Sequence, residues 1–273
     1  MKKCNIKNVF VCNLRRVVIC GILLLTFIAT CNLQPATCNL YAQGANKEEE
    51  TLYVAKKAFE DGFYEVAISL LERFLKNYPA SPKLPQVKLL IGQCYFHQNR
   101  FLDALAKFEE LLSQPSAKNI RDEILYWIGE VHFRGNAFTR AGQYYKMIID
   151  ESPKSAYAAA SFYSLGWCLF QESDFSGAMK YFQIVEEKFP NESQARDSSF
   201  KIVECLYNLK EYSRLKDKIK SYLKIYSKDT VHLPYLYFYL AEANFYLDNF
   251  TESIDGYTKV LLNTSDTKMR ALS

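Results

Sequence analysis

Residues 159–193 read AASFYSLGWCLFQESDFSGAMKYFQIVEEKFPNES, and this stretch decides the fold. Its large apolar residues recur every three or four positions on both sides of Phe175, which is typical of two amphipathic helices. Gly166 and Ala178 are small at the two positions where such helices would cross and their backbones must approach closely. Pro190 cannot continue a helix, so it ends the pair. The stretch therefore predicts two antiparallel helices joined by a short turn directly before Phe175.

An aromatic residue recurs at the position of Phe175 at intervals of 37 or 38 residues. These residues, called here the anchor aromatics, are Tyr64, Phe101, Phe138, Phe175, Tyr212 and Phe250. A fixed period of this length indicates stacked helical repeats, because one helix pair cannot bury its apolar face alone. We expect an all-α fold, a right-handed superhelical solenoid of about six helix-turn-helix units. The expected units are about 48–81, 85–118, 122–155, 159–193, 196–229 and 234–267, within a repeat domain 48–265 that is followed by a tail, 266–273.

Five of the six units keep a small residue at the position of Gly166. The residues at this position are Ala55, Gly92, Gly129, Gly166, Val203 and Ala241. The fifth unit is the exception, with Val203 here and Leu215 at the position of Ala178, which predicts an adjusted helix crossing or a local break in the array. Between units, Ser81, Ser155 and Ser193 are expected to cap the next helix.

These units resemble the tetratricopeptide repeat (TPR), and the resemblance covers roughly residues 47 to 265. The closing phrases FLKNYPASP, IDESPKSAYAAA and EEKFPNESQA are similar to those of a narrower bacterial group. That group holds envelope proteins related to the BamD lipoprotein of outer-membrane assembly and to the YbgF coordinator of the Tol–Pal system. The resemblance implies a scaffold that binds other proteins.

The first 42 residues have the character of an export signal or an anchor, and residues 43–47 are expected to be a short linker. Five basic residues and no acidic ones lie in this segment, and an apolar run follows from Val17 to Thr30. Such a run is typical of a secretory signal and is short for a membrane span. Three outcomes remain open: cleavage after Ala42, lipid attachment at Cys31 within a near-lipobox that has Thr30 before the cysteine, or retention as an inner-membrane anchor. The expected location is the periplasm or the periplasmic face of the outer membrane.

The charge of the chain also depends on this segment. The whole sequence carries a net charge of +4, but the part after residue 42 holds 29 basic and 30 acidic residues. A repeat domain of about neutral charge lacks the basic surface that nucleic acid requires. We therefore expect no nucleic-acid partner.

Patterns typical of enzymes and metal sites do not occur in the sequence. The three histidines form no metal-binding motif with neighbouring ligand-type residues, and no CxxC or HExxH is found. Cys94, Cys168 and Cys205 share one position on the first helix of their units, which favours buried small apolar residues over disulfides. We expect no enzymatic activity, no cofactor and no metal.

In the first helix of each unit, aromatic and acidic residues recur next in sequence to the residues of the buried face. In resembling proteins such positions line a concave surface where peptides dock, and aromatic rings bury much area there at low entropic cost. The predicted partner-binding residues are Tyr126, Glu130, Tyr163, Trp167, Phe170, Phe200, Glu204, Phe238 and Glu242. A second row, from Phe59 to Phe245, is expected mainly to pack the repeats.

The sequence therefore predicts an exported scaffold that binds envelope proteins or peptides, with a BamD-like role in outer-membrane assembly as its most specific version. Alternatives are an adaptor in Tol–Pal, peptidoglycan or envelope polysaccharide processes, and a non-catalytic subunit of an enzyme complex. The apolar end of the sixth unit, Val260 to Leu262, is followed by only eleven residues. We expect that a second copy of the chain or a partner covers that end, or that the natural chain continues beyond Ser273.

Overall fold

The computed structural model describes residues 34–264, 266 and 271. Cys31 and the apolar run before it therefore lie outside the described residues, and side chains are described from Lys47 onward. The chain forms two compact units, Met1–Val87 and Lys88–Ser273, and each is considered by itself. Among the described residues, no helix is both long enough and apolar enough to cross a membrane.

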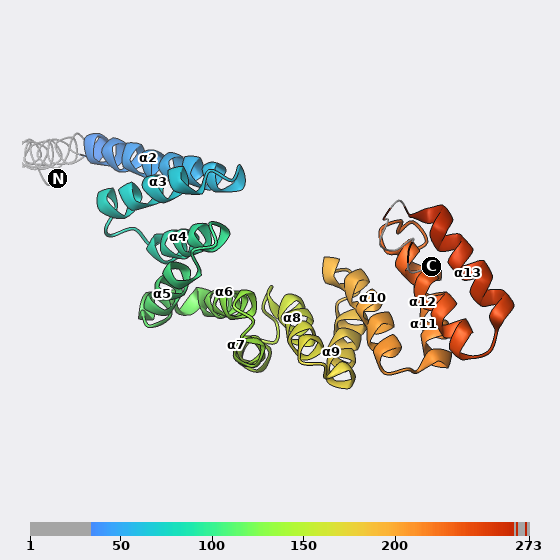
Figure 1. Ribbon diagram of the computed structural model, residues 1–273. Helices are drawn as coiled ribbons and strands as arrows, with labels where there is room; N and C mark the ends of the chain where they lie inside the picture. Colours follow the sequence, from blue (N-terminus) through green and yellow to red (C-terminus); the bar gives the residue numbers. More distant parts are fainter. Residues whose placement is uncertain (1–33, 265, 267–270, 272–273) are drawn as a thin grey trace, which may run out of the picture. The chain divides into compact units, whose positions relative to one another are not determined.

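Within its described residues, the first unit contains a helical hairpin formed by α2 (Gln34–Glu60) and α3 (Tyr64–Asn77) (Figure 1). Its core includes Ala55 at the small position of α2 and Leu71 on α3, both fully buried. The helix α2 begins well before residue 48 and runs through residues 43–47, so these residues are helical where a linker was expected.

The second unit continues the same arrangement of paired helices. Its helices are α4 (Leu84–His97, from Lys88 onward), α5 (Phe101–Leu112), α6 (Arg121–Arg134), α7 (Phe138–Glu151), α8 (Ala158–Gln171), α9 (Phe175–Lys188), α10 (Ser193–Asn208), α11 (Tyr212–Ile225), α12 (Leu233–Tyr246) and α13 (Phe250–Asn263). A short 3-10 helix, η1 (Pro115–Ile120), stands between α5 and α6. The all-helical repeat fold is confirmed. Each anchor aromatic is the first residue of the second helix of its pair, as predicted.

The turn before each anchor aromatic has the same backbone geometry in all six repeats. The residue two positions before the aromatic has a positive φ, and these residues are Gly62, Asn99, Asn136, Ser173, Lys210 and Asp248. The next residue donates its N–H to a carbonyl five positions earlier at 2.8–3.0 Å, as in Phe63 to Ala58 and Asp174 to Leu169. This pattern is the Schellman motif, which satisfies the carbonyl groups at a helix end. Each helix pair is therefore joined by the same left-handed turn.

Small and large residues complement each other where the paired helices cross. A Cβ atom at Gly92, Gly129 or Gly166 would lie 2.4–2.8 Å from a ring atom of Phe108, Tyr145 or Phe182, respectively. The close packing predicted for these glycines is confirmed. In the fifth repeat Val203 is fully buried in one core cluster with Ile219, which stands where those three repeats carry an aromatic ring. The larger residue on one helix is thus matched by a smaller one on the other, and both helices of this repeat are continuous.

Ser81 and Ser155 lie two residues before the N-cap positions of α4 and α8, so neither is the N-cap that was expected. Ser81 and Ser155 each accept a hydrogen bond from the N–H two residues later, at 3.1 and 3.0 Å. Each hydroxyl also donates to a carboxylate 33 residues earlier, Glu48 and Asp122 respectively. These serines therefore connect consecutive repeats. The expectation for Ser193 was wrong, because this residue is the first of α10 and its hydroxyl donates to the Gln194 side chain.

Candidate partner-binding surface

A pocket of about 410 Å³ opens in the second unit between the first helices of three consecutive repeats. Its lining residues come from α6, α8 and α10. They are Tyr126, Glu130, Phe133, Ala160, Tyr163, Ser164, Trp167, Gln171, Ser193, Gln194 and Asp197. Tyr126 and Tyr163 occupy equivalent positions 37 residues apart, as do Glu130 and Trp167. The repeat period therefore brings four of the predicted partner-binding residues into one pocket.

The aromatic walls of this pocket are partly buried and held by other rings. Tyr126 contacts Tyr145 and Tyr157, with ring centroids 5.8 and 5.1 Å away. Tyr163 meets Trp167 edge to face at 6.4 Å. These contacts fix the rings before any partner arrives, so little side-chain entropy remains to be lost on binding.

Glu130 is the acidic residue of α6 in the pocket lining, and it is oriented by hydroxyl groups. It accepts hydrogen bonds from the Tyr145 hydroxyl at 2.7 Å and from the Ser164 hydroxyl at 3.4 Å. Burial, together with the neighbouring Glu130 carboxylate, raises the pKa of Tyr145, so this phenol remains a donor. The Glu130 carboxylate thus has a fixed direction.

Two further acidic residues of the predicted set, Glu204 and Glu242, connect helices outside the pocket. Glu204 pairs with Lys201 and accepts from the Tyr239 hydroxyl at 3.3 Å. Glu242 accepts from the hydroxyls of Tyr207, at 3.0 Å, and Tyr257. Since Tyr239 and Tyr207 belong to neighbouring repeats, these carboxylates hold the array together.

Phe200 differs most from its predicted role. Its side chain is buried, with 7% of its surface exposed, and the ring lies against His232 with centroids 4.2 Å apart. Tyr235 and Tyr239 also contact this ring. Phe200 therefore offers almost nothing to a partner, because residues of the next repeat cover it.

Phe170 and Phe238 are half-buried and lie outside the pocket lining. Phe170 packs edge to face on the anchor aromatic Phe175 at 5.2 Å. The same contact is made by Phe59, Phe96, Phe133 and Phe245 with the anchor aromatics of their repeats. The packing role expected for this second row is confirmed for these residues. Phe238 contacts Tyr239 and Tyr257.

Lys201 is a residue of this surface that the sequence reasoning missed. Its Nζ atom lies 3.7 Å from the centroid of the Trp167 ring and 5.2 Å from that of Phe170. The ammonium group also pairs with Glu204, so a cation from α10 rests on the aromatic residues of α8. The i, i+3 spacing of Lys201 and Glu204 was the available sequence signal.

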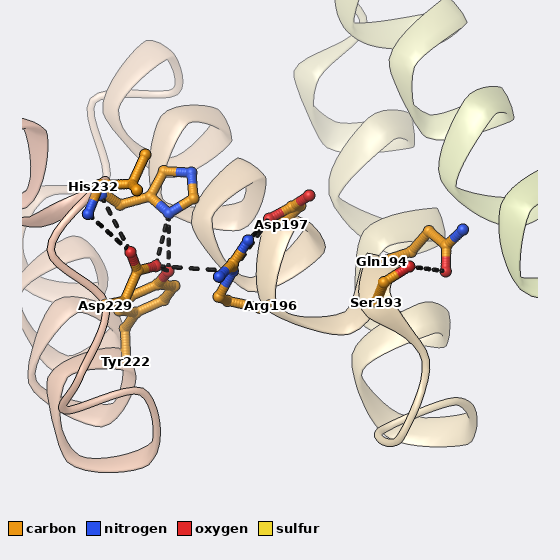
Figure 2. A network of polar contacts seen from close by, with 8 residues as sticks. Ser193, Gln194, Arg196, Asp197, Tyr222, Asp229 and His232 are labelled. Carbon is orange, nitrogen blue, oxygen red and sulfur yellow. Dashed lines mark hydrogen bonds and ion pairs between the residues drawn. The ribbon is translucent and has the colours of Figure 1, made fainter. Parts of the chain in front are cut away.

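A polar network joins the pocket to the start of the sixth repeat (Figure 2). Arg196 pairs with the pocket residue Asp197 at 3.2 Å and with Asp229 at 3.7 Å. The side chain of Asp229 is almost fully buried and accepts hydrogen bonds from the Tyr222 hydroxyl, from Nδ1 of His232 at 2.7 Å and from the Val231 N–H at 2.9 Å. Burial alone would raise the pKa of this carboxyl, but the bonds from Tyr222 and His232 outweigh it and lower the pKa to about 2. A fixed negative charge therefore anchors this junction.

The three cysteines of the repeats and His132 lie in the core. Cys94, Cys168 and Cys205 are free and buried, as predicted. His132 is buried and stacks on Tyr144 at 5.4 Å, and burial lowers its pKa. Among the described residues no group of three or more histidine, cysteine, aspartate or glutamate side chains could hold a metal ion.

Comparison with protein families gives two matches along the chain. Residues 55–120 and 117–156 match the family model of the tetratricopeptide repeat. Residues 155–253 match the model of an outer membrane lipoprotein family. Among curated protein sequences, none matches this chain significantly.

Solved structures with the same fold are numerous and distant in sequence. A tetratricopeptide repeat protein from Parabacteroides merdae has a TM-score of 0.61 at 16% identity, over 82% of each chain. The pilF protein of Pseudomonas aeruginosa has a TM-score of 0.63 at 12% identity, over 82% of this chain and 95% of that one. YrrB, described as a TPR protein with an unusual peptide-binding site, has a TM-score of 0.57 at 14% identity, over 73% of this chain and 94% of that one.

Fold, repeat geometry and family matches agree. The described part of this chain is an array of helical repeats with the fold of tetratricopeptide repeat proteins. Its residues 55–156 match the tetratricopeptide repeat family, and its residues 155–253 are similar to an outer membrane lipoprotein family.

Proposed function

We propose that this chain is a non-catalytic scaffold of the bacterial cell envelope that holds a segment of a partner protein in the pocket between α6, α8 and α10. The observation that carries the proposal is the pocket itself, where preorganised aromatic residues and the oriented Glu130 carboxylate meet. Concave, largely preformed sites with a few placed polar groups are typical of binding sites.

The similarity of residues 155–253 to an outer membrane lipoprotein family supports an envelope location. The matched range includes most of the pocket, namely its residues on α8 and α10. The most specific form of the proposal is a BamD-like role, in which the repeats are tethered by lipid at Cys31 and help to assemble outer-membrane proteins.

Affinity capture from detergent-solubilised envelopes of the source bacterium tests this proposal. The wild-type chain is compared with a Tyr163→Ala, Trp167→Ala double variant and with a matched control, Tyr53→Ala plus Phe63→Ala. The control rings are each 63% exposed and lie in the other unit. We expect barrel-assembly proteins to be captured by the wild type and the control, and to be lost with the double variant.

Other results would change the proposal in defined ways. Partners of Tol–Pal, peptidoglycan or polysaccharide processes, or the catalytic subunit of an enzyme, would replace the assembly role with one of the alternatives. Capture that is unchanged by the double variant, while its circular dichroism spectrum and melting temperature stay those of the wild type, would refute the pocket as the partner site.

A further inference from the structure

The charged residues that line the pocket are all acidic. Its lining includes two acidic residues, Glu130 and Asp197, and no lysine or arginine. Asp197 is already paired with Arg196 at 3.2 Å. Glu130, by contrast, is bonded to the neutral hydroxyls of Tyr145 and Ser164, and none of the ion pairs among the described residues involves it. The pocket thus presents one carboxylate that lacks a cationic partner.

The aromatic walls suit a cation as well. The faces of tyrosine and tryptophan rings attract ammonium and guanidinium groups, and more strongly where water is partly excluded. Tyr126, Tyr163 and Trp167 all contribute to the lining. Trp167 already holds such a group within this molecule, because Lys201 Nζ lies 3.7 Å from its ring centroid. An ammonium group on this aromatic surface is therefore a geometry that the chain itself adopts.

We propose that the pocket binds a lysine or arginine side chain of the partner segment, with the cationic group directed at Glu130 and the aliphatic stem against Tyr126, Tyr163 and Trp167. The inference rests on the proposed function and names the chemistry of the partner. An acidic side chain would meet the Glu130 and Asp197 carboxylates, and a neutral apolar one would remove water from Glu130 without replacing its interactions. Charge complementarity thus selects a basic segment.

A fragment titration of the full chain in non-ionic detergent tests this chemistry without knowledge of the partner. The probes are n-butylammonium, which mimics the end of a lysine side chain, and its neutral and anionic counterparts n-butanol and butyrate. The chain has two tryptophans, so the indole N–H signal of Trp167 can be followed by NMR and assigned with Trp167→Phe. We expect a saturable shift with n-butylammonium and less than about a tenth of that shift with the other two probes, given that charged hydrogen bonds are the stronger ones. Equal shifts with all three, or none with n-butylammonium, would overturn the inference.

A pair of charge-neutralising variants locates the interaction. Glu130→Gln keeps an acceptor for Tyr145 and Ser164 but removes the charge, and we expect n-butylammonium to bind about tenfold more weakly. Glu187→Gln removes the same charge from an exposed position on α9 and should bind as the wild type does. Equal weakening in both variants would mean that the overall field of the protein attracts the cation, which contradicts a specific site. The selectivity among the three probes in the wild type decides the question if Glu130→Gln does not fold.

This inference and the proposed function fail in different ways. Loss of captured partners with Tyr163→Ala plus Trp167→Ala, combined with no preference for n-butylammonium, would keep the scaffold and reject the cationic ligand. Unchanged capture with that double variant would reject the pocket as the partner site whatever the fragments do.

Discussion

The ring of Phe182 occupies the space that a side chain on Gly166 would need, since a Cβ atom there would lie 2.8 Å from Phe182 Cε1. The same relationship joins Gly92 to Phe108 and Gly129 to Tyr145. The aromatic residue on the second helix and the glycine on the first therefore pack as a pair. The effect on stability of a substitution at one of them should depend on the residue at the other.

Gly166→Ala should lower the free energy of unfolding. Alanine gains about 1 kcal/mol over glycine in helix propensity, whereas overpacking of a core typically costs about 1–3 kcal/mol. We expect a net loss, measured by urea denaturation. Gly135→Ala is the matched control, because the atoms nearest to its added Cβ lie at 3.5 Å or more.

Phe182→Leu should partly rescue Gly166→Ala. The first repeat already combines Ala55 with Leu71 at these two positions, and both are fully buried. A double-mutant cycle with no favourable coupling between the two changes would argue against the packing relationship.

The folded chain should lose stability in acid through Asp229. Its pKa is lowered to about 2 from an ordinary value of 3.8, so its contribution is complete above about pH 4 and disappears as the pH falls towards 2. The shift corresponds to about 2 kcal/mol. We expect the difference in unfolding free energy between the wild type and Asp229→Asn to shrink across this range.

Asp217→Asn serves as the control for that series, since Asp217 is exposed on the same helix as Tyr222, α11. A difference between wild type and Asp229→Asn that stays constant from pH 5 to pH 2 would show that the Asp229 carboxylate does not stabilise the junction.

The three cysteines of the repeats should react slowly in the folded chain. Burial raises the pKa of the Cys94, Cys168 and Cys205 thiols to about 12, so little thiolate exists at neutral pH. Iodoacetamide labelling at pH 8, followed site by site with mass spectrometry, should give slow modification in buffer and fast modification in urea. Fast labelling of any of the three in buffer would mean that its helix pair opens readily.

The lipid-anchored form of the proposed scaffold predicts lipid attachment at Cys31. Growth with a radioactive fatty acid should label the wild-type chain and leave Cys31→Ala unlabelled. A wild-type chain without label would exclude the lipid-anchored form of the scaffold and leave cleavage after Ala42 or a retained anchor.

The period of the anchor aromatics was enough to predict the helix pairs, because the burial of one helix face requires apolar residues at regular intervals in the sequence. The left-handed turns could not be predicted as fully. Gly62, Asn99, Asn136 and Asp248 favour a positive φ, but Ser173 and Lys210 adopt it only because the helix packing on both sides requires the same reversal.

The candidate site, too, could be predicted only in part from the sequence. Tyr126, Glu130, Tyr163 and Trp167 meet because equivalent positions on neighbouring helices follow from the period. Phe200 occupies the position of Tyr163 in the next repeat, yet it is covered by His232 and Tyr235. That cover depends on contacts between repeats, which the residue types within one repeat do not encode.

The junctions between repeats give the array a fixed order. Ser81, Ser155 and Asp229 occupy one position of the 37-residue period, and their partners 33 residues earlier are Glu48, Asp122 and Arg196. The junctions at Ser81 and Ser155 join a hydroxyl to a carboxylate, whereas the junction at Asp229 joins a carboxylate to a guanidinium group. If the segment with Asp229 were transplanted behind Asp122, two carboxylates would face each other. Although the repeats share one backbone plan, they are not interchangeable modules, and recombination within the gene would be penalised at these junctions.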